Sequence, residues 1–155
     1  MPSPADSGLD GSPRSVTGPR RWLGAAAVTG GVYLLAGVVF GALAGKAASQ
    51  RMVVAWRLAA WAVSGIAFGA HLIFDRWRRA GSPASTALHV ATGVALGALG
   101  LAAAAIAHAL ATQTGNLRLL TLALVAWPAL TALPAFVVAL GGAALLGRMR
   151  SFPPT

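Results

Sequence analysis

The sequence contains no cysteine and only three acidic residues, Asp6, Asp10 and Asp75. Without cysteine, disulfides and thiolate metal sites are excluded. Only Asp75 lies outside the N-terminal segment, and no carboxylate falls in the middle of a long apolar run. A proton-coupled cation exporter needs a buried carboxylate that exchanges a proton for its substrate. The scarcity of acids therefore argues against that class.

Catalytic motifs are missing as well. The sequence has no HExxH, Gly-x-Ser-x-Gly or Walker-type segment and no paired carboxylates. Membrane enzymes bring catalytic residues close to the membrane surface, and this chain has few polar residues to place there. We therefore expect a protein that is not an enzyme and that carries no resident cofactor.

Charge is scarce and unevenly placed. Charged residues make up 10% of the chain, whereas a soluble domain carries about 25%. Hydrophobic residues account for 57% and the mean hydropathy is +0.72. Because the charges stand between long apolar runs, the pattern is typical of membrane-spanning helices. The net charge of +9 does not indicate nucleic-acid binding, since the basic residues cluster at the ends of these runs, where anionic headgroups lie.

Four apolar segments predict an all-α, polytopic membrane protein, a bundle of four transmembrane helices within residues 22–147. The first is longer than the roughly 7–15-residue core of a signal peptide, so we expect a retained helix. Pro128 and Pro134 interrupt the last and predict a kink. Residues 1–21 are rich in Pro, Ser and Gly and predict a disordered tail, and residues 148–155 form a basic, Pro-rich tail. The predicted spans are 22–45, 52–74, 84–111 and 118–146.

Basic residues also predict the orientation. With the N-terminus inside, eight of the 12 lysines and arginines fall on the cytoplasmic side and four on the other. Cytoplasmic loops carry the excess of positive charge, so both termini are expected in the cytoplasm. Alanine and arginine usage is typical of high-GC bacterial genomes, which indicates a bacterial plasma membrane.

Glycines recur four residues apart in the first three segments. This spacing places them on one face of a helix, where another backbone can approach closely. We therefore favour a structural or accessory role, as a helix-packing subunit or a self-associating bundle, whose partners are further copies or other membrane subunits. The predicted packing residues are Gly37, Gly41, Gly45, Gly65, Gly69, Gly93 and Gly97.

The second segment carries a polar stripe, with most of its polar side chains at spacings of three, four or seven residues. Polar groups in a membrane avoid lipid, so the stripe is expected to face other helices. The short turn after it predicts an antiparallel hairpin that brings the stripe opposite the third segment. The resulting candidate polar site comprises Arg57, Ser64, His71, Asp75 and His89.

This candidate site allows three alternative functions: a small solute or ion carrier or channel lined by the stripe, a b-type haem between His71 and His89, and a metal site of two imidazoles and a carboxylate. The ordinary interpretation is that Asp75 pairs with neighbouring arginines. The basic cluster after it is then a contact with anionic lipid headgroups, formed by Arg76, Trp77, Arg78 and Arg79.

Overall fold

The protein is described by a computed structural model covering residues 18–79 and 81–149, with side chains described for 22–78 and 81–149. It contains four helices in these ranges and no strand: α1 (Gly18–Gly45), α2 (Gln50–Arg79), α3 (Pro83–Thr112) and α4 (Leu117–Met149). Each is long and apolar enough to cross a membrane. The predicted all-α class with four transmembrane helices is confirmed. The predicted tails lie mostly outside the described residues.

The helix ends follow local chemistry. Helix α1 begins four residues before the predicted Trp22, because Pro19 fits a first turn in which the backbone N–H has no helical partner. At the start of α2, the Ser49 hydroxyl lies 3.4 Å from the backbone N of Met52. Ser82 caps α3 in an extended conformation and accepts a hydrogen bond from Ser85 N at 3.2 Å, with Pro83 following it.

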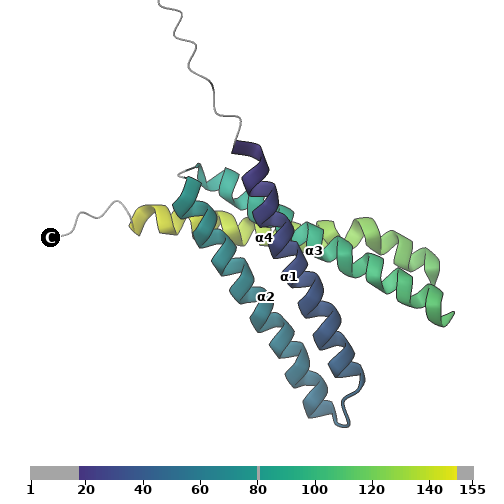
Figure 1. Ribbon diagram of the computed structural model, residues 1–155. Coiled ribbons are helices and arrows are strands. Elements are labelled where there is room, and N and C mark those ends of the chain that lie inside the picture. Colours follow the sequence, from purple (N-terminus) through teal and green to yellow (C-terminus); the bar gives the residue numbers. More distant parts are fainter. Residues whose placement is uncertain (1–17, 80, 150–155) are drawn as a thin grey trace, which may run out of the picture.

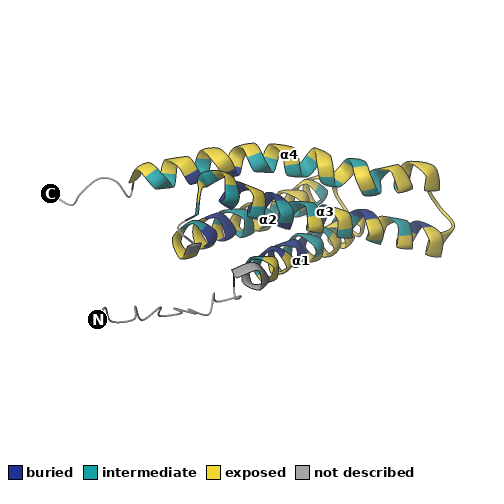
Figure 2. Cartoon of the chain, turned by 90° about the horizontal axis from the view of Figure 1, so that it is seen from above, coloured by how far each residue is buried: buried dark blue, intermediate teal, exposed yellow. Residues whose placement is uncertain are grey.

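The helices form two antiparallel hairpins, α1–α2 and α3–α4, which cross near one end and separate toward the other (Figure 1). The crossing brings together the start of α1, the end of α2, the start of α3 and the end of α4 (Figure 1). Both described ends of the chain therefore lie at the same end of the molecule, as four consecutive crossings require. Figure 2 shows exposed residues covering most of α4.

Helices α2 and α3 contact each other near the turn that joins them and then diverge, because α3 packs mainly on α4 and α1 (Figure 1). The sequence predicted a hairpin in which the polar stripe of α2 faces α3. In the structure this arrangement holds for the last turns of α2, where His71 and Asp75 lie, whereas the hairpins separate beyond them.

Small residues form the crossing of α1 and α3. A Cβ added at Gly30 would lie 3.1 Å from the Gly93 carbonyl oxygen and 3.2 Å from the Gly97 backbone N. A Cβ added at Gly97 would lie 2.6 Å from Tyr33 Cβ. The two backbones thus approach closely, as glycine allows. A second, mainly small-residue cluster joins α2, α3 and α4 and consists of Leu72, Ala87, Val90, Ala139 and Ala143.

Helix α4 is one continuous helix through Pro128 and Pro134. Each proline leaves the carbonyl four residues earlier without its usual N–H donor. The two carbonyls are those of Leu124 and Leu130. The helix nevertheless continues from Leu117 to Met149 and is long and apolar enough for a single crossing, as the sequence predicted.

Candidate functional site

The polar residues gather at the crossing of the two hairpins, around Asp75 and His89. Asp75 lies one turn before the end of α2 and is only 1% exposed. Its Oδ2 lies 3.0 Å from Nδ1 of His89, on the second turn of α3. Contact with a carboxylate is strongest when the imidazole donates the proton. The structure thus joins two of the predicted site residues directly.

The turn between α2 and α3 fixes this geometry. The guanidinium of Arg76, next to Asp75, donates from Nη1 to the Gly81 carbonyl at 2.7 Å. The Ser82 cap then starts α3 at a defined register. Because both helix ends are anchored to the same short turn, Asp75 and His89 are held on facing surfaces.

Helix α1 completes the surroundings of His89. The indole of Trp22 stacks on the imidazole, with ring centroids 4.7 Å apart and planes inclined by 21°. The sequence analysis did not predict this contact. Nothing in the local pattern could have revealed it, because the contact depends on how α1 crosses α3.

His71 lies one turn before Asp75 on α2 and is buried, with 5% of its surface exposed. It packs against Gly93 of α3, where an added Cβ would lie 3.4 Å from the imidazole Nδ1 and Cε1. Gly93 follows His89 by one helical turn, so the two histidines occupy successive levels of the α2–α3 contact. Of the predicted polar site, His71, Asp75 and His89 are therefore brought together; we call them the junction cluster.

Arg57 and Ser64 are not part of the junction cluster. Arg57 is exposed and Ser64 is half-buried. Asp75 follows Arg57 by 18 residues, which corresponds to about 27 Å of helix. The hairpins separate toward the α1–α2 turn (Figure 1), and Arg57 lies in the first third of α2, on the side of that turn. The five residues therefore do not form one continuous site within the chain.

Two of the alternative functions place a cofactor at the junction cluster, either a metal ion or a haem. Among residues 18–79 and 81–149, no three His, Asp or Glu side chains are placed to hold a metal ion, which gives the metal alternative no support. A haem between the two histidines would have to enter a region where His89 stacks on Trp22 and His71 packs on Gly93. The haem interpretation stays a prediction.

Only part of the predicted headgroup cluster is exposed to the surroundings of the protein. The Arg76 guanidinium makes contacts within the protein. It donates to the Gly81 carbonyl, and it lies against Gly147 of α4, where an added Cβ would be 2.7 Å from Nη2. Trp77 and Arg78 are exposed and remain suited to headgroup contact, and the Arg78 guanidinium lies 5.5 Å from the Phe74 ring centroid. The side chain of Arg79 is outside the described residues.

Some of the predicted packing glycines lie in close contacts between helices, and the others do not. Gly37 abuts Leu101 of α3, while Gly93 and Gly97 lie in the close contacts already described. At the remaining positions, an added Cβ would meet nothing within 4 Å, so close packing there stays a prediction about contacts between chains. These positions are Gly41, Gly45, Gly65 and Gly69.

Comparison with known proteins assigns no family: no protein-family model matches the chain, and neither a curated protein nor a solved structure is significantly similar to it. Functional inference therefore depends on the geometry. The junction cluster links α2 and α3 through a part-buried hydrogen bond, and the ring of Trp22 stacked on His89 adds α1. This arrangement braces the two hairpins against each other.

Proposed function

We propose that the protein is a non-enzymatic, structural or accessory membrane protein that self-associates through α2. The observation that carries this proposal is the lack of burial along most of α2. No residue from Gln50 to Ala70 is buried within the chain. The helix therefore presents most of its length to lipid or to another protein.

One face of α2 is suited to a second copy. Gly65 and Gly69 lie four residues apart, with open space at both Cβ positions. Beside them, Leu58 and Ile66 are 63% and 73% exposed. Paired glycines let two helix backbones approach closely without polar groups. Since an uncharged, smooth face is complementary to itself, it fits a symmetric dimer.

Replacing these glycines should separate the copies. We expect Gly65→Leu and Gly69→Leu each to raise the dimer dissociation constant by about tenfold or more, a loss of roughly 1.4 kcal/mol, because the added side chain holds the backbones apart. Native mass spectrometry of protein extracted in a mild detergent measures the oligomer directly. Gly141→Leu is the matched control, since Gly141 of α4 also has open space around it.

An oligomer that survives both α2 substitutions would refute this interface. A different membrane polypeptide bound to the wild type and lost from both variants would instead identify α2 as the docking face for another subunit. Loss of the oligomer in Gly141→Leu as well would show that bulk, rather than the position on α2, is responsible.

We further propose a bacterial plasma membrane location with both termini in the cytoplasm, supported by the distribution of lysine and arginine. A green fluorescent protein fused to the C-terminus should fluoresce, and an alkaline phosphatase fused there should be inactive. Active phosphatase with a dark fluorescent fusion would reverse the orientation.

The carrier alternative stays a prediction with its own test. It requires His71→Ala or Arg57→Ala to abolish transport at an unchanged protein level in the membrane. Within one chain, however, the stripe is divided between a closed junction cluster and the exposed Arg57. The geometry therefore gives the carrier less support than the packing role.

A further inference from the structure

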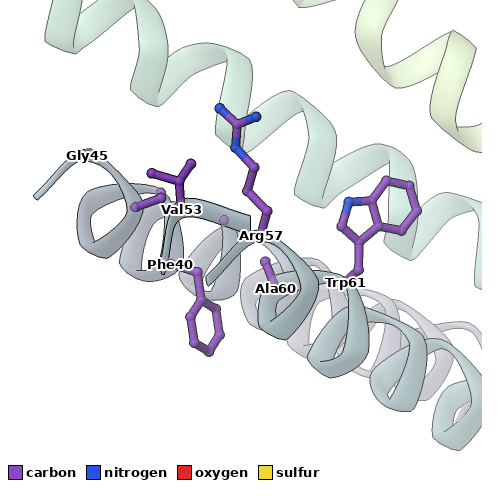
Figure 3. A pocket seen from close by; sticks show the side chains of 9 residues that line it. Phe40, Gly45, Val53, Arg57, Ala60 and Trp61 are labelled. Atoms are coloured by element: carbon purple, nitrogen blue, oxygen red, sulfur yellow. The ribbon is translucent and has the colours of Figure 1, made fainter. Parts of the chain in front are cut away.

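A groove between α1 and α2 lies toward the turn that joins these helices, away from the junction cluster. It has a volume of about 380 Å³ and is bounded on α1 by Gly37, Gly41 and Gly45 and on α2 by Val53, Arg57 and Trp61. Figure 3 shows Arg57 and Trp61 projecting from the same side of α2. Gly41 and Gly45 have nothing within 4 Å of their Cβ positions, so the α1 wall is open backbone there, and Phe40 and Ala44 supply its apolar side chains.

Arg57 brings a positive charge into this apolar groove. It lies seven residues into α2, about 10 Å along the helix from Gln50. A charged side chain inside a membrane helix is costly, and the cost falls when the group reaches a counter-charge near the interface. An anionic neighbour close to the membrane surface would therefore stabilise the Arg57 guanidinium in this position.

The described part of the chain does not supply that anion. Its one carboxylate is Asp75, which is buried against His89 and lies about 27 Å farther along α2. The described residues of a second copy would bring only the same buried Asp75, so they do not provide the counter-charge either. Lys46 and Arg51 lie at the same end of the hairpin, so this end of the molecule attracts anions.

We propose that the α1–α2 groove binds one anionic phospholipid, whose phosphate contacts the Arg57 guanidinium while an acyl chain lies against the glycine wall. A guanidinium presents paired donors that match phosphate oxygens, and Lys46 and Arg51 complement the remaining negative charge of the headgroup. An acyl chain is slim and apolar, which suits a wall made of glycines and the apolar side chains of Phe40 and Ala44. This lipid site is independent of the proposed dimer face, which lies at Gly65 and Gly69.

The test is lipid binding to the full chain in detergent, followed by native mass spectrometry. Phosphatidylglycerol and phosphatidylcholine with identical acyl chains are titrated separately. We expect the wild type to bind one phosphatidylglycerol at least tenfold more tightly than phosphatidylcholine. Arg57→Gln should lose at least tenfold in affinity for phosphatidylglycerol, whereas Arg118→Gln, at the other hairpin's turn, should stay within about twofold of the wild type.

Two further arms separate the site from general charge attraction. Gly41→Leu fills the groove and keeps Arg57, so it should weaken binding of the long-chain lipid. Arg57→Lys keeps the charge without the paired donors and should fall between wild type and Arg57→Gln; it also serves if Arg57→Gln does not fold. Inorganic phosphate at millimolar concentration should not displace the lipid.

Equal binding of both lipids by the wild type, or unchanged binding by Arg57→Gln and Gly41→Leu, would overturn the proposal. Displacement by inorganic phosphate would assign the groove to a small anion. Release of a second membrane protein from Arg57→Gln, with lipid binding unchanged, would assign Arg57 to a carboxylate of that partner.

Discussion

Gly97→Ala and Gly30→Ala should each lower the free energy of unfolding by about 1–3 kcal/mol, the usual range for an overpacked contact. At Gly97 the added methyl group would lie 2.6 Å from Tyr33 Cβ and 3.1 Å from the Gly30 carbonyl oxygen. Neither atom is the far end of a flexible side chain. Relief therefore requires α1 and α3 to move apart, which loosens the contact that joins the two hairpins.

Gly31 provides the matched control. It is the sequence neighbour of Gly30 on the same helix, yet an added Cβ there would meet nothing within 4 Å. Gly31→Ala should therefore be neutral or stabilising by up to about 1 kcal/mol, because alanine favours the helical backbone. Unfolding in mixed micelles with increasing sodium dodecyl sulfate, followed by tryptophan fluorescence, gives the three values. Equal effects at Gly30 and Gly31 would show that α1 and α3 are not in close contact.

The second large effect concerns the Asp75–His89 contact. Substitutions of these two residues should change the free energy of unfolding in a non-additive way. His89→Phe retains a ring that can stack on Trp22 and removes the nitrogen that faces Asp75. Since it takes a hydrogen-bond partner from a buried carboxylate, we expect it to cost about 1–3 kcal/mol. Asp75→Leu removes the carboxylate and leaves His89 without this acceptor.

The double variant should be less destabilised than the sum of the single variants, because replacing both polar partners leaves neither one buried alone. We expect a coupling energy within the range of about 0.5–3 kcal/mol found for contacting residues. The same micelle unfolding assay measures all four proteins of the cycle. Effects that add to within about 0.5 kcal/mol would show that the two side chains do not interact. His108→Phe, at an exposed position of α3, controls for the change of ring.

Much of the helical architecture is predictable because it depends on neighbours along the chain. The uncharged run from Trp22 to Gly45 is long enough to span a membrane, whatever the other helices do. The start of α3 depends on Ser82 and Pro83, which are neighbours in the sequence, since capping involves only the first helical turn. Helix α4 kept its expected extent through two prolines, because an unbroken helix satisfies its backbone better than any other structure in lipid.

The candidate site was only partly predictable. His71 and Asp75 share a face of α2 by spacing alone, and the short turn correctly suggested that His89 lies opposite. Arg57 belongs to the same stripe by sequence, yet it lies apart because α2 and α3 diverge. The glycine pattern likewise could not distinguish Gly97, which packs on α1, from Gly41, which faces a groove.

The sequence by itself determined the number of helices long and apolar enough to cross a membrane, the approximate extent of each, and which side chains share a face. Helical periodicity and apolar length are properties of one segment. The tertiary structure decided that α3 packs on α1 and α4, that Trp22 covers His89, and which glycines lie in contacts. Those features follow from the crossing of the two hairpins. Inside lipid, helix association depends on close packing and on hydrogen bonds between helices more than on hydrophobicity, and a single segment's pattern does not specify the crossing.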